Sequence, residues 1–173
     1  MTNPHGAKHH YEHGIKEGSW MAMKKHLEND MLCNSLRGRI RYQLDVYHRY
    51  GSSGNCIMIM LDGKTVMKAG FMYAHAQMMK NGMICEGQHV WDVPMSDRDV
   101  YDDAEVMDAL RRYRNQTIQD SLSSDNPIER FFAIVDRRVG KRTLLKMRSQ
   151  IEAQPNWLQT VYRARYSAEG IRF

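Results

Sequence analysis

The chain has 173 residues, of which 42% are hydrophobic and 26% are charged, and its formal net charge is +5 at pH 7. This length and composition fit one globular domain with its own core and exclude a wholly disordered chain. No apolar run approaches the ~20 residues of a membrane-spanning helix, so we expect no membrane partner.

The first 18 residues predict a mobile arm that precedes a single domain over residues 19–173. The arm contains Pro4, three glycines and no apolar period, and it lacks the apolar stretch of a secretory signal. The three cysteines of the chain form no CxxC pair, so we expect free thiols and a cytoplasmic location. His9 and His13 would share a face if the arm were helical, a spacing that can bind a transition metal. A polar, disordered terminus is the preferred interpretation, and we expect no bound metal.

A helix is predicted between Ser19, a typical N-cap, and a break at Gly38. Apolar residues recur there at spacings of three and four, which indicates one buried helical face. These residues are Trp20, Met23, Leu27 and Met31.

Three antiparallel strands are predicted next. Over residues 39–49, side chains expected to face inward alternate with side chains expected to face outward, which is typical of a strand with one buried face. Its inward set is Ile40, Tyr42, Leu44, Val46 and His48, and its outward arginines are Arg39, Arg41 and Arg49. Residues 51–55 are expected to form a hairpin loop and residues 56–61 a second strand. Asp62-Gly63 is a two-residue turn signal, and residues 64–69 complete the meander.

The middle of the chain predicts a short helix over residues 71–80 and two short strands at residues 83–85 and 90–93. Seven acids against one arginine lie between Asp92 and Asp108. Residues 96–99 and 102–105 both resemble capping boxes, which begin helices. The apolar stripe of the longer helix consists of Val106, Leu110, Tyr113 and Thr117.

The C-terminal part predicts a helical layer. Residues 121–125 are expected to form a loop, and Asn126-Pro127-Ile128-Glu129 is a strong helix start. We expect that helix to continue to Gly140, with Ile128, Phe131, Phe132, Val135 and Val139 facing inward. Residues 144–151 and 155–168 predict two more helices. The predicted fold class is α+β: an antiparallel β-meander with an N-terminal helix and a C-terminal helical layer.

The densest basic run surrounds Gly140. It consists of Arg137, Arg138, Lys141, Arg142, Lys146 and Arg148. From Asn126 to the end, ten lysines and arginines stand against four acids, a net charge of +6. Such a corner could bind phosphates through its side chains and the free N–H groups of the following helix, with base stacking from Tyr113, Tyr162 and Tyr166. The alternative is a solvated helical surface with internal ion pairs, such as Asp136 with its neighbours.

A weaker candidate site consists of Asp45, Asp62 and Lys64. They match the arrangement of a large nuclease superfamily, in which two carboxylates hold Mg²⁺ and a lysine orients the attacking water. Asp62-Gly63 is also what a tight hairpin requires, and turn chemistry explains it fully.

Two cysteine–histidine pairs could form a nucleophile and its base: Cys85 with His89, and Cys56 with His48. Nothing in the sequence places a third group, and an isolated cysteine is usually a small buried hydrophobe. The loop over residues 51–55 lacks the lysine and the helix of a P-loop, and we expect no cofactor.

Two stretches carry a family resemblance. LCNSLRGRI at residues 32–40 is followed by DGK at residues 62–64, and DRRVGKR at residues 136–142 is followed by AEGI at residues 168–171. Together they resemble a family of small bacterial proteins without a known activity. The resemblance implies a bacterial or phage cytoplasmic origin and adds no catalytic residue.

The leading functional expectation is a non-enzymatic protein that binds nucleic acid or another polyanion through its basic C-terminal helices. A protein–protein interaction module or a homodimeric adaptor is the alternative, because 14 methionines could supply an adaptable contact surface. A metal-dependent nuclease comes third.

Overall fold

The computed structural model describes residues 20–49 and 52–172. The arm over residues 1–18 and the Ser19 cap lie outside the described residues, as do the side chains of residues 46–49 and 52–54. The strands are β1 (Ile40–Arg49), β2 (Ser52–Leu61) and β3 (Lys64–Ala69). The α-helices are α2 (Trp20–Lys25), α3 (Phe71–Lys80), α4 (Asp103–Asn115), α5 (Ile118–Leu122), α6 (Pro127–Val135), α7 (Lys141–Met147) and α8 (Asn156–Ala168). A π-helical turn η1 (His26–Met31) and the 3₁₀ turns η2 (Asn34–Leu36), η3 (Val90–Asp92), η4 (Met95–Asp97) and η5 (Arg148–Gln150) complete the set.

The sheet is an antiparallel meander in the order β1-β2-β3, which confirms the predicted α+β class. Asp62 and Gly63 form the turn between β2 and β3, with φ angles of 51° and 78°. Both angles lie in the left-handed region that a primed hairpin turn requires. The first hairpin is tighter than expected, because residues 52–55 continue β2 and Arg49 pairs with Ser52. The prediction of a loop over residues 51–55 was therefore wrong for residues 52–55.

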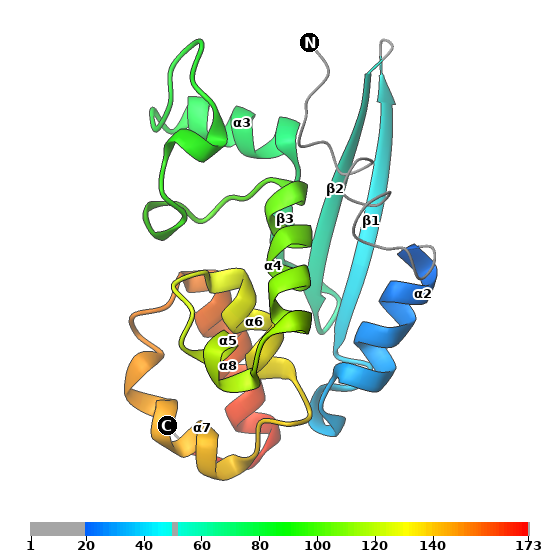
Figure 1. The fold of residues 1–173 in the computed structure, drawn as a ribbon, viewed down its shortest axis with the longest axis vertical. Helices are drawn as coiled ribbons and strands as arrows, with labels where there is room; N and C mark the ends of the chain where they lie inside the picture. Colours follow the sequence, from blue (N-terminus) through cyan, green and yellow to red (C-terminus); the bar gives the residue numbers. More distant parts are fainter. Residues whose placement is uncertain (1–19, 50–51, 173) are drawn as a thin grey trace.

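One end of the sheet is flanked by the C-terminal helices (Figure 1). Phe131 on α6 is fully buried and lies between rings from distant parts of the chain. Its ring centroid is 6.2 Å from that of Tyr42 on β1 and 5.9 Å from that of Trp157 on α8. The core cluster includes Phe131, Val135 and Trp157, and Trp20 and Leu44 are only partly buried against it. Close-packed aromatic rings at these distances contribute beyond the area that they bury.

The N-terminal helix docks on the sheet through a buried carboxylate. Met23 and Leu27 are buried as predicted, and the chain then widens into the π-helical turn η1. Glu28 in this turn accepts a hydrogen bond from the backbone N–H of Tyr42 at 2.8 Å and one from Arg41 at 2.9 Å. The positive charge of the outward arginines on β1 is thus partly neutralised, because Arg41 forms an ion pair with Glu28.

Helix α3 belongs to a small lobe at the opposite end of the molecule from α7 (Figure 1). It starts and ends where the sequence predicts. The two short strands predicted at residues 83–85 and 90–93 are wrong: residues 90–92 form the turn η3. The carboxylate of Asp92 accepts a hydrogen bond from the backbone N–H of His89 at 2.8 Å, and this local cap favours a turn over an extended strand.

Helix boundaries in the second half of the chain also differ from the prediction. The capping box at Asp102 forms as expected, whereas residues 95–97 make only the short turn η4. Thr117 is exposed and caps α5 through the N–H of Asp120, so the predicted loop at residues 121–125 begins only after Leu122. A side chain that hydrogen-bonds the backbone in this way competes with helix continuation.

Candidate functional site

Helix α6 ends at Val135, five residues before the predicted end at Gly140. The backbone leaves the helix because it pairs with the segment that follows η1. The N–H of Cys33 donates to the carbonyl of Val135, and the N–H of Arg137 donates to the carbonyl of Met31, both at 2.9 Å. This antiparallel contact brings the segments at residues 31–37 and 136–140 side by side, and the basic run begins on the second of them and continues along α7. The strands, α6 and α7 can be followed in Figure 1.

Asp136 is the buried anchor of this turn, with only 1% of its side chain exposed. Its carboxylate accepts hydrogen bonds from the Arg138 guanidinium at 2.7–3.1 Å, from the backbone N–H of Arg138 at 2.7 Å, and from the hydroxyl of Tyr113. The hydrogen bond to Asp136 raises the pKa of Arg138, and burial raises the pKa of Tyr113 well above its usual value, with Asp136 acting in the same direction. Arg138 is therefore committed to a structural ion pair.

A pocket of about 620 Å³ opens on one side of the turn. Arg37, Arg137 and Arg165 line it, together with Ser35 and Glu169. Arg165 is 2% exposed, and its guanidinium donates to the Ser35 hydroxyl at 2.5 Å and pairs with Glu169 at 2.7 Å. The Ser35 hydroxyl in turn donates to Glu169 at 2.7 Å. The pocket floor is thus a closed, charge-balanced network, with exposed arginines above it.

A smaller pocket of about 330 Å³ adjoins the same turn, and Arg137 lines both pockets. Five arginines and two carboxylates line the two pockets together. The arginines are Arg37, Arg114, Arg137, Arg138 and Arg165, and the carboxylates are Asp136 and Glu169. Concave surfaces of one charge sign concentrate the field and attract counter-ions.

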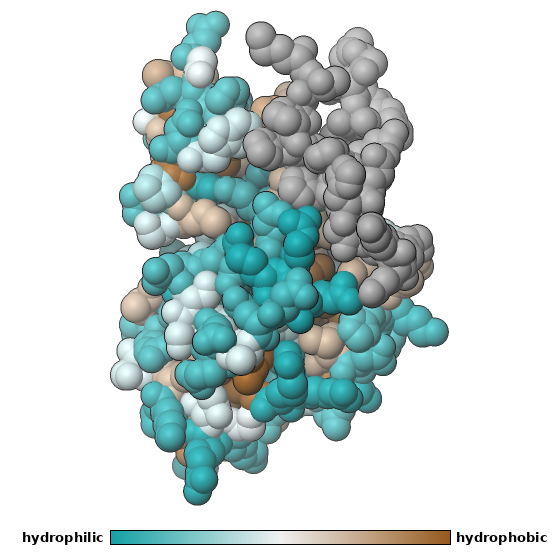
Figure 2. Space-filling view, viewed as in Figure 1, coloured by the Kyte–Doolittle hydropathy of each residue, from teal (hydrophilic) through white to brown (hydrophobic). Residues whose placement is uncertain are grey.

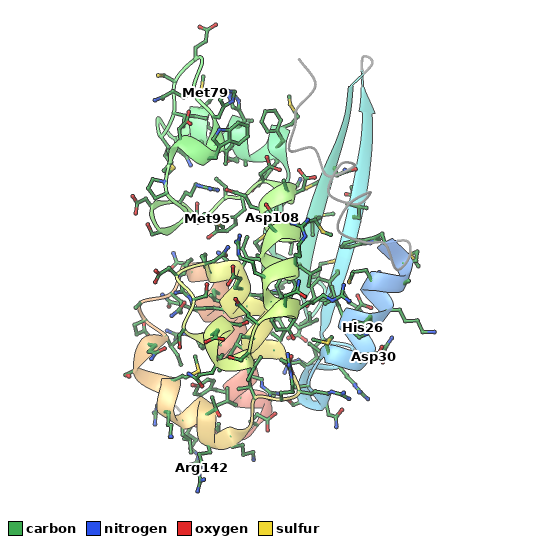
Figure 3. The ribbon with its side chains drawn as sticks, in the orientation of Figure 1. His26, Asp30, Met79, Met95, Asp108 and Arg142 are labelled. Atoms are coloured by element: carbon green, nitrogen blue, oxygen red, sulfur yellow. The ribbon has the colours of Figure 1, made fainter. Side chains whose placement is uncertain are left out.

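The remaining predicted basic residues are exposed on α7 and η5. They are Lys141, Arg142, Lys146 and Arg148. Arg142 extends beyond the ribbon at the end of the molecule (Figure 3), and in the space-filling view this end is mostly hydrophilic (Figure 2). The stacking residues expected beside them are not available. Tyr113, Tyr162 and Tyr166 are all buried.

The sequence did not indicate Arg37, Arg114 or Arg165 as site residues. Arg37 was visible only as part of the LCNSLRGRI motif, and Arg165 only as one of several C-terminal arginines. Ser35 and Arg165 are 130 residues apart in the chain, so no local pattern could reveal their contact.

The residues of the nuclease-like arrangement are placed apart. Asp45 is opposite Cys56 in the register, whereas Asp62 is in the turn that follows Leu61, the partner of Ile40. Five residues of strand separate the two carboxylates by roughly 17 Å. Asp62 instead accepts two hydrogen bonds from Arg39, at 2.7 and 2.8 Å, and the hydrogen bond lowers its pKa. The two carboxylates cannot share one ion, and Lys64 is exposed at the start of β3.

The Cys85–His89 pair does not form, and the side chain of His48, the expected partner of Cys56, lies outside the described residues. The Cys85 thiol donates to the Gln88 side chain at 3.0 Å, and His89 stacks on Trp91 with ring centroids 4.6 Å apart. Cys56 is buried, and burial raises the pKa of its thiol. A thiol in that state is a poor nucleophile.

A pair of buried carboxyl groups lies at the start of α4. Asp102 and Asp103 are 1% and 2% exposed, and one oxygen of each has no hydrogen-bond partner among the described residues. Burial raises the pKa of Asp103 to about 8, and the neighbouring Asp102 acts in the same direction. Two adjacent carboxylates in a dry site cannot both ionise easily, so Asp103 holds a proton at neutral pH.

Within residues 20–49 and 52–172, no group of three or more histidine, cysteine, aspartate or glutamate side chains is arranged to hold a metal ion. None of the helices in this part of the chain combines the length and apolar content that a bilayer crossing requires.

No curated protein and no solved structure matches the chain. A family model does match it, over residues 19–166, and this family has no known activity, as the motif resemblance implied. The matched range includes the whole basic run and every pocket residue named above except Glu169. The chain therefore belongs to the SF0329 protein family.

Proposed function

We propose that the protein is a non-enzymatic binder of nucleic acid or another polyanion. The binding surface is the basic corner, which we define as Arg137, Lys141, Arg142, Lys146 and Arg148. Arg138 is excluded from this surface because its guanidinium is bound to Asp136. The motif resemblance to small bacterial proteins supports a bacterial or phage cytoplasm as the setting in this proposal.

The observation that supports this function is uncompensated charge. No acid occurs between Arg137 and Arg148 in the sequence. Among the described residues, no carboxylate forms an ion pair with any member of the basic corner, and all five side chains are exposed. Charges that are not used within the fold are free to replace the counter-ions of a phosphate backbone.

The arrangement favours binding that does not depend on base sequence. Arg142 and Lys146 are four residues apart on α7 and share one helical face, where they are neighbours. The aromatic residues near the corner are buried in the core, so they are not available to stack on bases. Contacts to phosphate fix position and carry no sequence information.

The test is fluorescence anisotropy with labelled single-stranded and double-stranded oligonucleotides of unrelated sequences. The double variant Arg142→Ala/Lys146→Ala should weaken binding to all of them by a similar factor. The matched control is Lys80→Ala, which removes an exposed positive charge from α3, at the other end of the molecule. It should leave the affinity nearly unchanged.

An equal loss of binding free energy per removed charge in the two variants would mean that only the total charge matters and that the basic corner is not a site. No measurable binding of the wild-type protein at low salt would refute the proposal directly.

A protein–protein interaction role remains the second candidate, and it is supported by the lobe around α3. Met72, Met79 and Trp91 are 69%, 40% and 42% exposed there, which is unusual for large apolar side chains. The variant Met72→Lys should reduce self-association in sedimentation velocity experiments if this surface joins two copies. A wild-type protein that sediments as a monomer at high concentration would argue against the homodimer.

A further inference from the structure

The pocket of about 620 Å³ beside the basic corner has a chemistry of its own. We infer that it is a phosphomonoester site, in which Arg37 and Arg137 hold the terminal phosphate of a nucleotide or of an oligonucleotide end. This inference deepens the proposed function and rests on it, since the pocket adjoins the surface that would bind the rest of the polyanion.

The charge balance of the pocket matches a doubly charged phosphate. Arg165 and Glu169 neutralise each other at the floor. Arg37 and Arg137 at the rim leave two positive charges without a carboxylate partner among the described residues. A phosphomonoester carries about −1.5 to −2 charges at pH 7, whereas each phosphodiester of a backbone carries about −1.

The floor of the pocket is fixed before any ligand arrives. The Arg165 guanidinium donates to the Ser35 hydroxyl and to the carbonyl of Val139, at 2.5 and 2.8 Å, and is 2% exposed. Its Nε is buried without a hydrogen-bond partner among the described residues. Polar groups that are fixed in this way before binding need no reorganisation when an anion enters the pocket.

The volume and the lining of the pocket suit the terminal nucleotide of a chain. The hydrogen-bonded network of Ser35, Arg165 and Glu169 forms part of the wall of the pocket. Its volume is in the range of about 300–1,000 Å³ that small ligands occupy, enough for a nucleotide unit. The described lining residues include no aromatic side chain, so the phosphate, not the base, would be recognised.

The arginines come from two elements that the fold brings together. Arg37 follows η2, and Arg137 lies in the turn after α6, next to the backbone pairing at Met31. Arginine forks held on separate segments can donate to different oxygens of one phosphate, and a monoester offers three such oxygens.

The experiment compares two 3′-labelled oligonucleotides that differ only in a 5′-phosphate or a 5′-hydroxyl. The phosphorylated form should bind about tenfold tighter, because one extra charge-assisted contact accounts for that ratio. Arg37→Ala should abolish the preference while leaving the hydroxyl form bound as before, since Arg37 lies outside the basic corner. Arg37→Lys, which keeps the charge but loses the fork, should retain part of the preference. Unchanged melting temperatures would show that both variants fold.

A second arm uses calorimetry with a nucleoside monophosphate and with the matching nucleoside. The monophosphate could bind in a way that Arg37→Ala abolishes, while the oligonucleotides show no preference for a 5′-phosphate. That result would identify a free nucleotide as the ligand and support the site. If neither the 5′-phosphate nor the monophosphate is preferred over its control, the inference is wrong. In that case, binding of the 5′-hydroxyl oligonucleotide that depends on Arg142 and Lys146 would leave the proposed function intact.

Discussion

Arg138 and Arg142 are both exposed arginines near the same turn, yet the structure assigns them different roles. Replacing Arg138 by Met keeps the aliphatic stem and removes the guanidinium that binds Asp136. The carboxylate of Asp136, 1% exposed, would keep only the backbone N–H of Arg138 and the hydroxyl of Tyr113. Replacing Arg142 by Met removes a charge that has no described partner.

The expected loss of stability in Arg138→Met follows from the burial of its ion pair with Asp136. Removing one partner of a fully buried ion pair costs about 3–5 kcal/mol in stability. The Arg138 side chain is 49% exposed, so water can reach the vacated position and recover part of that loss. We expect a cost of about 2 kcal/mol for Arg138→Met, which lowers Tm by roughly 4–8 °C in a protein of this size. Arg142→Met should change stability by no more than about 0.5 kcal/mol.

The assay is thermal unfolding followed by circular dichroism for the wild type and both variants. Adding Asp136→Asn to Arg138→Met should recover part of the loss, because the buried charge is then gone and the two positions are coupled. Equal melting temperatures for Arg138→Met and Arg142→Met would refute the structural role of Arg138.

Three further predictions concern the core and the buried acids. Phe131→Ala should cost about 3–5 kcal/mol in urea unfolding, the usual loss for a buried aromatic, and a loss under 1 kcal/mol would contradict the packing. Because Asp103 binds its proton more tightly when folded, with a pKa raised to about 8, stability should fall as pH rises from about 4 to about 8. Asp103→Asn should flatten that fall in Tm measured across the range, and an unchanged slope would rule out Asp103 as its cause. Gly70→Ala should destabilise by about 1–3 kcal/mol, because its Cβ would lie 2.6 Å from the carbonyl oxygen of Asn55, and a wild-type Tm would show that the strands can adjust.

The elements that the sequence predicted correctly depend on local rules. Asp62-Gly63 supplies the positive φ angles of its turn, and Asn126 caps α6 through the N–H groups of Ile128 and Glu129. The alternation over residues 39–49 determines which side of β1 is buried, so Tyr42 is in the core. These signals act within a few residues and need no knowledge of the fold.

The errors arise where distant segments decide the outcome. The stripe over α6 continues to Val139, which is buried, yet the helix stops at Val135 because Leu32 and Asp136 form a β-bridge. Pairing with β1 likewise extends β2 back to Ser52 through residues that resemble a loop.

In the candidate site, too, local features could be predicted from the sequence and long-range contacts could not. The basic run was visible in the sequence, because charge density is a property of composition. The sequence did not show that Arg138 is paired whereas Arg137 has no carboxylate partner among the described residues. This difference depends on the burial of Asp136 and on the position of Tyr113. The pocket is lined by Ser35 and Arg165, which are 130 residues apart in the chain, so only the fold reveals it.

The most direct test of the central claim is the salt dependence of oligonucleotide binding. If the basic corner binds phosphates, the affinity for a double-stranded oligonucleotide should fall steeply with salt, and log K against log salt concentration should be a straight line. Arg142→Ala/Lys146→Ala should reduce the slope by about two units, one for each lost contact. A slope that is the same for the wild type and the double variant, or an affinity that does not change with salt, would contradict the account.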